Sequence, residues 1–152
     1  MNDFYDDLAR GKRGEKLVYD ALTARGSIIT DLRDDREARF NDIDFLLEKD
    51  GKTTTLEVKT DFRSEETGNL FIEYENSNNK SHKYKGWYCY CKAQYLCFVQ
   101  ETARKAYIVL FDELKQTLKK NTFRTANSKN AVGFLFPLTR LAQLETYRII
   151  DL

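Results

Sequence analysis

The chain has 152 residues, a formal net charge of +1 and 32% charged residues. This length allows one domain with its own core, and the near-neutral charge means that an anionic partner would have to be met by local basic patches. One proline and seven glycines argue against a disordered or proline-rich segment. Because the sequence has no long apolar run and no leader pattern at its N-terminus, we expect a soluble, cytoplasmic protein.

Residues 3–25 have apolar residues near helical spacing, and Gly26 is a plausible end for a helix. Gly11 and Gly14 lie within this pattern and each cost about 1 kcal/mol relative to alanine. They either divide the helix in two or allow another backbone to come close. Residues 27–32 read as a short strand, and residues 33–40 as a mixed-charge loop.

Residues 41–60 read as two strands joined by Asp50-Gly51, a pair that tolerates the positive φ angles of a type I′ turn. Counting outward from a two-residue turn gives the pairing of the strands, which places polar and apolar side chains on opposite faces. The pairs are Lys49 with Lys52, Phe45 with Leu56, Asp44 with Glu57, Ile43 with Val58, and Asp42 with Lys59. The apolar face would carry Ile43, Phe45, Leu56 and Val58.

The rest of the chain predicts more strands and helices around a mixed sheet. The expected strands are 70–75, which would continue from the hairpin, and then 95–100, 106–110 and 133–138. The expected helices are 80–92, 113–120 with Asp112 as its cap, and 140–146 with Thr139 as its cap. Residues 64–69 and 121–130 read as polar loops. This order is typical of a single α/β or α+β domain. The three cysteines, Cys89, Cys91 and Cys97, suit buried free thiols better than a disulfide framework or a zinc site.

Two carboxylates facing each other across a strand pair repel, so Asp44 and Glu57 indicate a divalent cation between them. Mg²⁺ takes oxygen ligands and needs only one or two carboxylates, and the Val58 carbonyl could supply a third oxygen. Lys59 shares this face, where its ammonium could orient or help deprotonate a water and neutralise a phosphate oxygen. The alternative is the solvated face of an amphipathic strand. Asp42 either pairs with Lys59 or is surface charge.

Glu57-Val58-Lys59 on a strand, with Asp44 across the hairpin and Glu15 on the preceding helix, resembles the PD-(D/E)XK nuclease superfamily. Ile43 stands where many members have proline, and the resemblance spans residues 11–99. It implies a restriction-endonuclease-like mixed β-sheet flanked by helices, as a single domain over residues 1–152. It also implies an Mg²⁺-dependent DNA endonuclease, with Mn²⁺ as a substitute, in which Glu15 would bind a metal-bound water or a second metal.

The segments FIEYE, GW and AQYLCFV are similar to the Holliday-junction-resolvase and restriction-enzyme-like branches. A resolvase would act on branched DNA as a homodimer. The alternatives are a restriction- or repair-type endonuclease, or a non-catalytic nucleic-acid-binding module of the same fold. We expect neither a membrane partner nor a small-molecule cofactor.

Basic residues on two segments are candidates for contacts with DNA phosphates. They are Lys12 and Arg13 beside Glu15, and Lys80, Lys83 and Lys85 in the expected helix 80–92. Trp87 could stack on DNA or belong to the core. Gln94 precedes a buried strand, where some nucleases of this superfamily have a polar active-site residue.

Overall fold

The computed structural model describes residues 3–79 and 82–152. A six-stranded mixed sheet forms the centre of the molecule, in the order β1-β2-β3-β6-β7-β10. Neighbouring strands are antiparallel except β3 and β6, which are parallel. Its strands are β1 (Ile28–Asp31), β2 (Phe45–Lys49), β3 (Lys52–Thr60), β6 (Tyr95–Gln100), β7 (Lys105–Leu110) and β10 (Arg148–Asp151).

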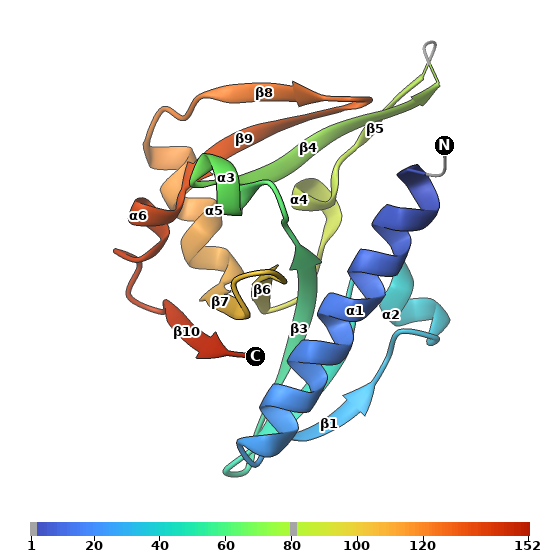
Figure 1. Ribbon diagram of the computed structural model, residues 1–152, viewed down its shortest axis with the longest axis vertical. Helices are drawn as coiled ribbons and strands as arrows, with labels where there is room; N and C mark the ends of the chain where they lie inside the picture. Colours follow the sequence, from blue (N-terminus) through green and yellow to red (C-terminus); the bar gives the residue numbers. More distant parts are fainter. Residues whose placement is uncertain (1–2, 80–81) are drawn as a thin grey trace.

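A second sheet, which the sequence analysis did not predict, packs against the first (Figure 1). Its four antiparallel strands run in the order β5-β4-β9-β8. They are β4 (Asn69–Asn79), β5 (His82–Lys85), β8 (Thr125–Ser128) and β9 (Ala131–Pro137). The expected strand 70–75 therefore exists, but it belongs to this second sheet and does not extend the β2–β3 hairpin.

Six helices complete the described part of the chain. They are α1 (Asp3–Ala24), α2 (Arg36–Phe40), α3 (Ser64–Thr67), α4 (Trp87–Tyr90), α5 (Phe111–Lys120) and α6 (Leu138–Leu141). None of the helices in these ranges combines the length and apolar character needed to cross a membrane. The mixed α/β sheet flanked by helices is confirmed.

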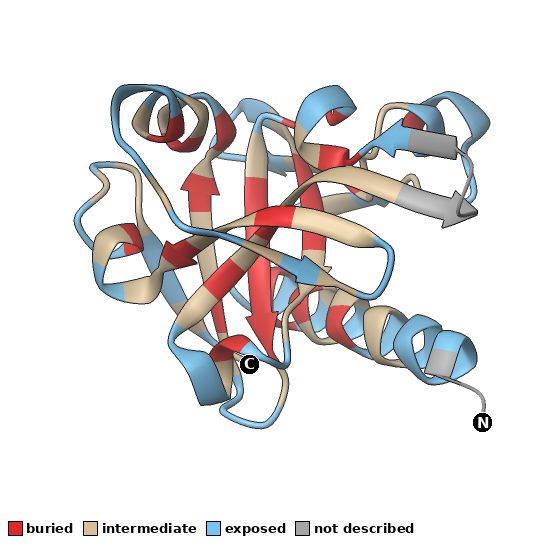
Figure 2. Cartoon of the chain, turned by 90° about the horizontal axis from the view of Figure 1, so that it is seen from above, coloured by how far each residue is buried: buried red, intermediate tan, exposed pale blue. Residues whose placement is uncertain are grey.

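The centre of the six-stranded sheet is buried, as the central strands in Figure 2 show, whereas the edge strands β1 and β10 are mostly exposed. Side chains of β6 alternate between two cores: Cys97 and Val99 pack under α1, whereas Leu96 and Phe98 pack against the second sheet. A strand buried on both faces reads as a continuous apolar run. This explains why residues 95–100 were recognised from the sequence without a clear alternation.

Several sequence predictions were wrong at the level of elements. Residues 33–40 contain α2, whose N-terminus is capped when the Asp35 carboxylate accepts from the Ala38 N–H at 2.8 Å. Residues 64–69 contain α3, and 121–130 contain β8. Residues 80 and 81 of the expected helix 80–92 lie outside the described residues, and the rest contains β5 followed by the one-turn α4, because β5 pairs with β4 and tertiary pairing overrides local propensity.

The two later helices begin earlier than predicted, and neither uses its expected cap. α5 has Leu110 as its N-cap, with Asp112 inside the first turn, and α6 has Pro137 as its N-cap, with Thr139 inside the helix. β10 was missed. The three cysteines are free, as expected, but Cys89 is exposed while Cys91 and Cys97 are buried.

Candidate active site

The β2–β3 hairpin has the register predicted from its turn. Phe45 pairs with Leu56, and Lys49 pairs with Lys52. Asp50 and Gly51 have φ angles of 53° and 74°, as a type I′ turn requires. Counting from the turn therefore predicts the position of every residue of this hairpin from Phe45 to Leu56.

The regular ladder ends at Asp44, one residue before β2. The Asp44 N–H donates to the Leu56 carbonyl at 3.0 Å, and its carboxylate accepts from the Val58 N–H at 2.9 Å. Because the chain bends here, Ile43 packs in the core against the second sheet, whereas Phe45 and Val58 pack under α1. The prediction that Ile43 shares their face was wrong.

Asp44 lies against Glu57, although the two do not form a regular ladder pair. Burial raises the pKa of Asp44, while the hydrogen bond from the Val58 N–H lowers it. The charge of Asp44 in turn raises the pKa of Glu57. The two acids therefore lie close enough to repel one another, as the opposed carboxylates of the sequence pattern predicted.

Glu57 is the most deeply buried acid of the site, with 5% of its surface exposed. One oxygen, Oε1, lies 3.1 Å from Lys59 Nζ, while Oε2 is buried without a hydrogen-bond donor. Burial raises the pKa of Glu57 well above its ordinary value, and Lys59 only partly offsets this. A buried carboxylate oxygen without a donor is costly, and a bound cation would satisfy it.

Lys59 is held by two carboxylates and an aromatic ring. Its Nζ lies 2.9 Å from Asp42 Oδ2 and 5.2 Å from the centre of the Trp87 ring, in addition to its contact with Glu57. Burial lowers the pKa of Lys59, but attraction to Glu57 and Asp42 outweighs burial and leaves the pKa above its ordinary value. The ammonium thus stays charged, and Asp42 is the partner of Lys59 rather than simple surface charge.

The position of Asp42 comes from the end of α2. Asp42 has a φ of 56°, its N–H donates to the Arg39 carbonyl, and the next N–H, that of Ile43, donates to the Ala38 carbonyl at 2.9 Å. These are the two bonds of a Schellman motif, which needs a left-handed residue at the position of Asp42. Aspartate tolerates this conformation better than most residues.

Glu15 reaches the site from α1, which packs on the sheet through Val18 and Leu22. Burial raises the pKa of Glu15, and the nearby Asp44 raises it further, while Arg33 lowers it. Gly14 allows this approach, because a Cβ at this position would lie 2.0 Å from Thr60 Oγ1. Of the two readings left open by the sequence, close approach is therefore correct for Gly14, and α1 is unbroken at Gly11 as well.

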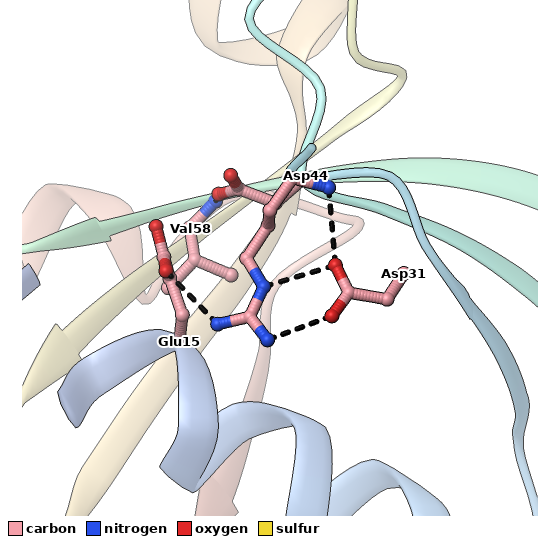
Figure 3. Close-up of polar contacts among 5 residues, drawn as sticks. Glu15, Asp31, Asp44 and Val58 are labelled. Atoms are coloured by element: carbon pink, nitrogen blue, oxygen red, sulfur yellow. Dashed lines mark hydrogen bonds and ion pairs between the residues drawn. The ribbon is translucent and has the colours of Figure 1, made fainter. Parts of the chain in front are cut away.

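Arg33 connects Glu15 to the sheet, as the dashed lines in Figure 3 show. Its Nη1 donates to Glu15 at 3.2 Å, and its Nε and Nη2 donate to the two oxygens of Asp31 at 2.9 and 2.7 Å. The sequence analysis assigned no role to Arg33 or Asp31. Their short spacing on a mixed-charge segment did not predict a contact with Glu15, because only the fold brings that segment to α1.

A cleft of about 580 Å³ opens over this site. One wall carries Glu15, Glu57, Val58 and Lys59, and the opposite wall is formed by the second sheet. The residues from β4 and from the β8–β9 hairpin include Phe71, Glu73, Asn76, Ser128, Lys129, Asn130 and Ala131. Glu73 accepts a hydrogen bond from the Asn76 side chain at 3.2 Å. The sequence analysis did not assign these polar residues to the site.

The basic residues predicted to contact DNA do not line this cleft where the structure describes them. Lys12 and Arg13 are exposed on α1, and Arg13 forms an ion pair with Glu101 at 2.6 Å. Lys80 lies outside the described residues, and so does the side chain of Lys83, while Lys85 is exposed at the end of β5. Besides Lys59, the basic side chains that line the cleft in the described part of the chain are Arg10 and Lys129.

Two further candidates have structural roles. Gln94 accepts hydrogen bonds from Thr54 and from the Thr55 N–H, so it is bound to β3, and it does not line the cleft. Trp87 is 8% exposed and belongs to the core between the sheets, although Lys59 lies over its ring.

The two carboxylates of the site suit Mg²⁺, which keeps several waters, better than they suit a metal whose ligands all come from the protein. Across residues 3–79 and 82–152, no three His, Cys, Asp or Glu side chains are grouped so as to hold a metal. Mg²⁺ keeps several waters and uses one or two carboxylates. Asp44 and Glu57, with the orphaned Glu57 Oε2, meet that smaller requirement.

The fold of the molecule is similar to that of a known nuclease. The structure of a bacterial homing endonuclease, I-Ssp6803I, is similar to it, with a TM-score of 0.53 over 68% of each chain and 16% sequence identity. At this identity the likeness concerns the fold alone. No protein-family model matches the sequence, and no curated protein matches it.

Proposed function

We propose that this protein is an Mg²⁺-dependent DNA endonuclease of the PD-(D/E)XK type. The observation that carries the proposal is that Glu15, Glu57 and Lys59 line one cleft of a nuclease-like fold, with Asp44 next to Glu15 and Glu57. Asp44 and Glu57, with the Val58 carbonyl, would hold the ion. When bound, Mg²⁺ supplies positive charge for the phosphate and lowers the pKa of a coordinated water.

The chain's own residues would then orient the water and stabilise charge on the phosphate. Lys59 keeps its charge between Asp42 and Glu57, which favours a role in orienting water and stabilising charge on the phosphate over a role as a base. Glu15 would accept a hydrogen bond from a water at the metal. Release of Lys59 from Glu57, once that carboxylate binds the ion, would leave the ammonium free to face a phosphate oxygen.

DNA is the proposed substrate, and the homing endonuclease fold supports it. From the sequence we favour a structure-specific enzyme of the junction-resolvase kind, acting as a homodimer. The fold similarity to a homing endonuclease favours a second candidate, an enzyme that cuts duplex DNA at one site. A non-catalytic module would bind DNA without needing the ion.

Incubation of the purified protein and Mg²⁺ with four-way junctions, and in parallel with a library of linear duplexes, separates these proposals. A resolvase cuts junctions symmetrically and spares duplexes, whereas a site-specific enzyme cuts a few library members. Sedimentation of the protein on a junction tests the homodimer.

Glu57→Gln and Lys59→Ala should each lower cleavage at least about 100-fold, as removal of one stabilising group does elsewhere. Glu48→Gln and Lys52→Ala are matched controls, because both residues are exposed on the same hairpin. They should leave cleavage unchanged. Equal cleavage by Glu57→Gln and the unaltered protein would refute the assignment of the site.

A further inference from the structure

We propose that the guanidinium of Arg33 takes the place of a second divalent cation beside Glu15, so that each chain binds one divalent cation. This inference rests on the proposed metal-dependent function, which it deepens by giving the number of ions. Arg33 is then a positioning residue that acts through Glu15, and the single ion lies between Asp44 and Glu57.

The first observation is that the guanidinium is already engaged by carboxylates at all three of its nitrogens. Nε and Nη2 form a two-pronged contact with Asp31, and Nη1 contacts Glu15. Asp31 also accepts from the Arg33 backbone N–H at 3.0 Å. A guanidinium that is held in this way is not free to bind a phosphate in the same fork geometry. A structural role for Arg33 therefore fits these contacts better than a role in binding DNA.

The second observation is that Arg33 is built into the framework of the metal site. Its guanidinium carbon lies 5.4 Å from the centre of the ring of Phe45, which is fully buried. The adjacent Leu32 N–H donates to the Asp44 carbonyl at 2.9 Å, and Asp31 pairs with Phe45 in the sheet. The segment that carries Arg33 is therefore bound directly to the backbone of a proposed metal ligand.

The charges around Arg33 explain the role of its guanidinium. Arg33 bridges Glu15 and Asp31 through two ion pairs, and Asp44 lies near Glu15, so without Arg33 these carboxylates would repel one another and attract a cation. Arg33 supplies a positive charge there without a metal. A divalent ion approaching Glu15 would meet a fixed like charge, whereas the space between Asp44 and Glu57 lies next to a buried oxygen that has no donor.

The test is the number of Mn²⁺ ions bound, measured without DNA by isothermal titration calorimetry and by electron paramagnetic resonance. The unaltered protein should bind one ion per chain with an uncoupled spectrum. Arg33→Met removes the charge and should bind two, with magnetic coupling between them. Adding Glu15→Gln to Arg33→Met should return the number to one. Arg36→Met, a change at an exposed arginine of the adjacent α2, should leave it at one.

Two ions in the unaltered protein would overturn the inference, and this measurement does not depend on any variant. One ion in a folded Arg33→Met protein would also overturn it. If Arg33→Met does not fold, as judged by circular dichroism, Arg33→Gln keeps an amide donor for Asp31 and should bind two ions. No Mn²⁺ binding at all by the unaltered protein would instead refute the proposed metal-dependent function.

Discussion

Gly14 of α1 lies directly against Thr60 of β3. A Cβ at Gly14 would lie 2.0 Å from Thr60 Oγ1 and 3.3 Å from Thr60 Cβ. The Thr60 hydroxyl is itself buried without a hydrogen-bond partner. This contact sets the distance between the helix that carries Glu15 and the strand that carries Glu57 and Lys59.

Gly14→Ala should therefore destabilise the protein by about 1–3 kcal/mol, the usual cost of overpacking a close contact. It should also lower cleavage, because α1 must move away from β3 and takes Glu15 with it. Gly11→Ala is the matched control on the same helix. Nothing lies within 4 Å of a Cβ at Gly11, so this change should stabilise by up to about 1 kcal/mol.

Chemical denaturation measures both effects. Thr60→Ala on the Gly14→Ala background removes the clashing oxygen and should recover most of the lost stability. Equal stability of Gly14→Ala and Gly11→Ala would show that the helix does not depend on this contact.

The metal-free protein should lose stability as pH rises from about 5 to 9, because of Glu57. Burial raises the pKa of Glu57 in the folded state above its unfolded value. Between these two values the unfolded chain has lost a proton that the folded chain keeps, so the free energy of unfolding falls with pH. Below the unfolded value both states are protonated, and the full stability is present.

Glu57→Gln should remove this slope and make the metal-free protein more stable than the unaltered protein at pH 8, although it abolishes cleavage. Thermal unfolding in EDTA at several pH values tests this, with Glu48→Gln as the exposed control. Mg²⁺ at 100 times its dissociation constant should stabilise only proteins that retain Glu57, by about 2.7 kcal/mol. A Glu57→Gln protein less stable than the unaltered one at pH 8 would contradict the prediction.

Asp42 has two separable roles, which different substitutions distinguish. Asn keeps a side chain that tolerates the φ of 56°, but it removes the charge that holds Lys59. Asp42→Asn should therefore lower cleavage, and it should destabilise the protein by about 1–3 kcal/mol, since it removes one partner of a part-buried ion pair.

Asp42→Ala should also remove the charge. It should lower the free energy of unfolding by about 1 kcal/mol more than Asp42→Asn does, because alanine is strained in the left-handed region. Comparison of the two variants by denaturation and by single-turnover cleavage separates backbone strain from charge. If Asp42→Asn cleaves as fast as the unaltered protein, Asp42 does not position Lys59.

Arg10 and Lys129 line the cleft and should contact DNA phosphates. Each phosphate contact steepens the dependence of log affinity on log salt by about 0.9. Arg10→Gln and Lys129→Gln should therefore each flatten that slope by about one unit, as measured by fluorescence anisotropy in Ca²⁺ to prevent cleavage. Lys52→Gln, on the tip of the β2–β3 hairpin, should leave the slope unchanged.

The same measurement of salt dependence tests the DNA contacts that were predicted from the sequence. If DNA extends from the cleft along β5, Lys85→Gln should also flatten the slope by about one unit. If Lys85→Gln changes the slope and the two cleft variants do not, DNA lies on a different surface from the one proposed.

Turn geometry, helical spacing and apolar runs were sufficient to predict the parts of the molecule whose contacts are close in sequence. The Asp50-Gly51 turn defines the register of β2 and β3, because a two-residue loop leaves no freedom in the pairing. Helical spacing and Gly26 predicted α1, and continuous apolar runs predicted β6 and β7. α1 carries Glu15, β3 carries Glu57 and Lys59, and Asp44 directly precedes β2, so the principal site residues could be proposed from the sequence by itself.

Only the tertiary structure decided which of these elements are neighbours. The parallel pairing of β3 with β6, the second sheet that forms the far wall of the cleft, and the Arg33–Glu15 contact all join segments distant in the chain. Residues 80–92 were misjudged for the same reason, since pairing with β4 outweighs their local preference. Periodicity reports which face of an element is buried, whereas the partner on that face depends on how the whole chain packs.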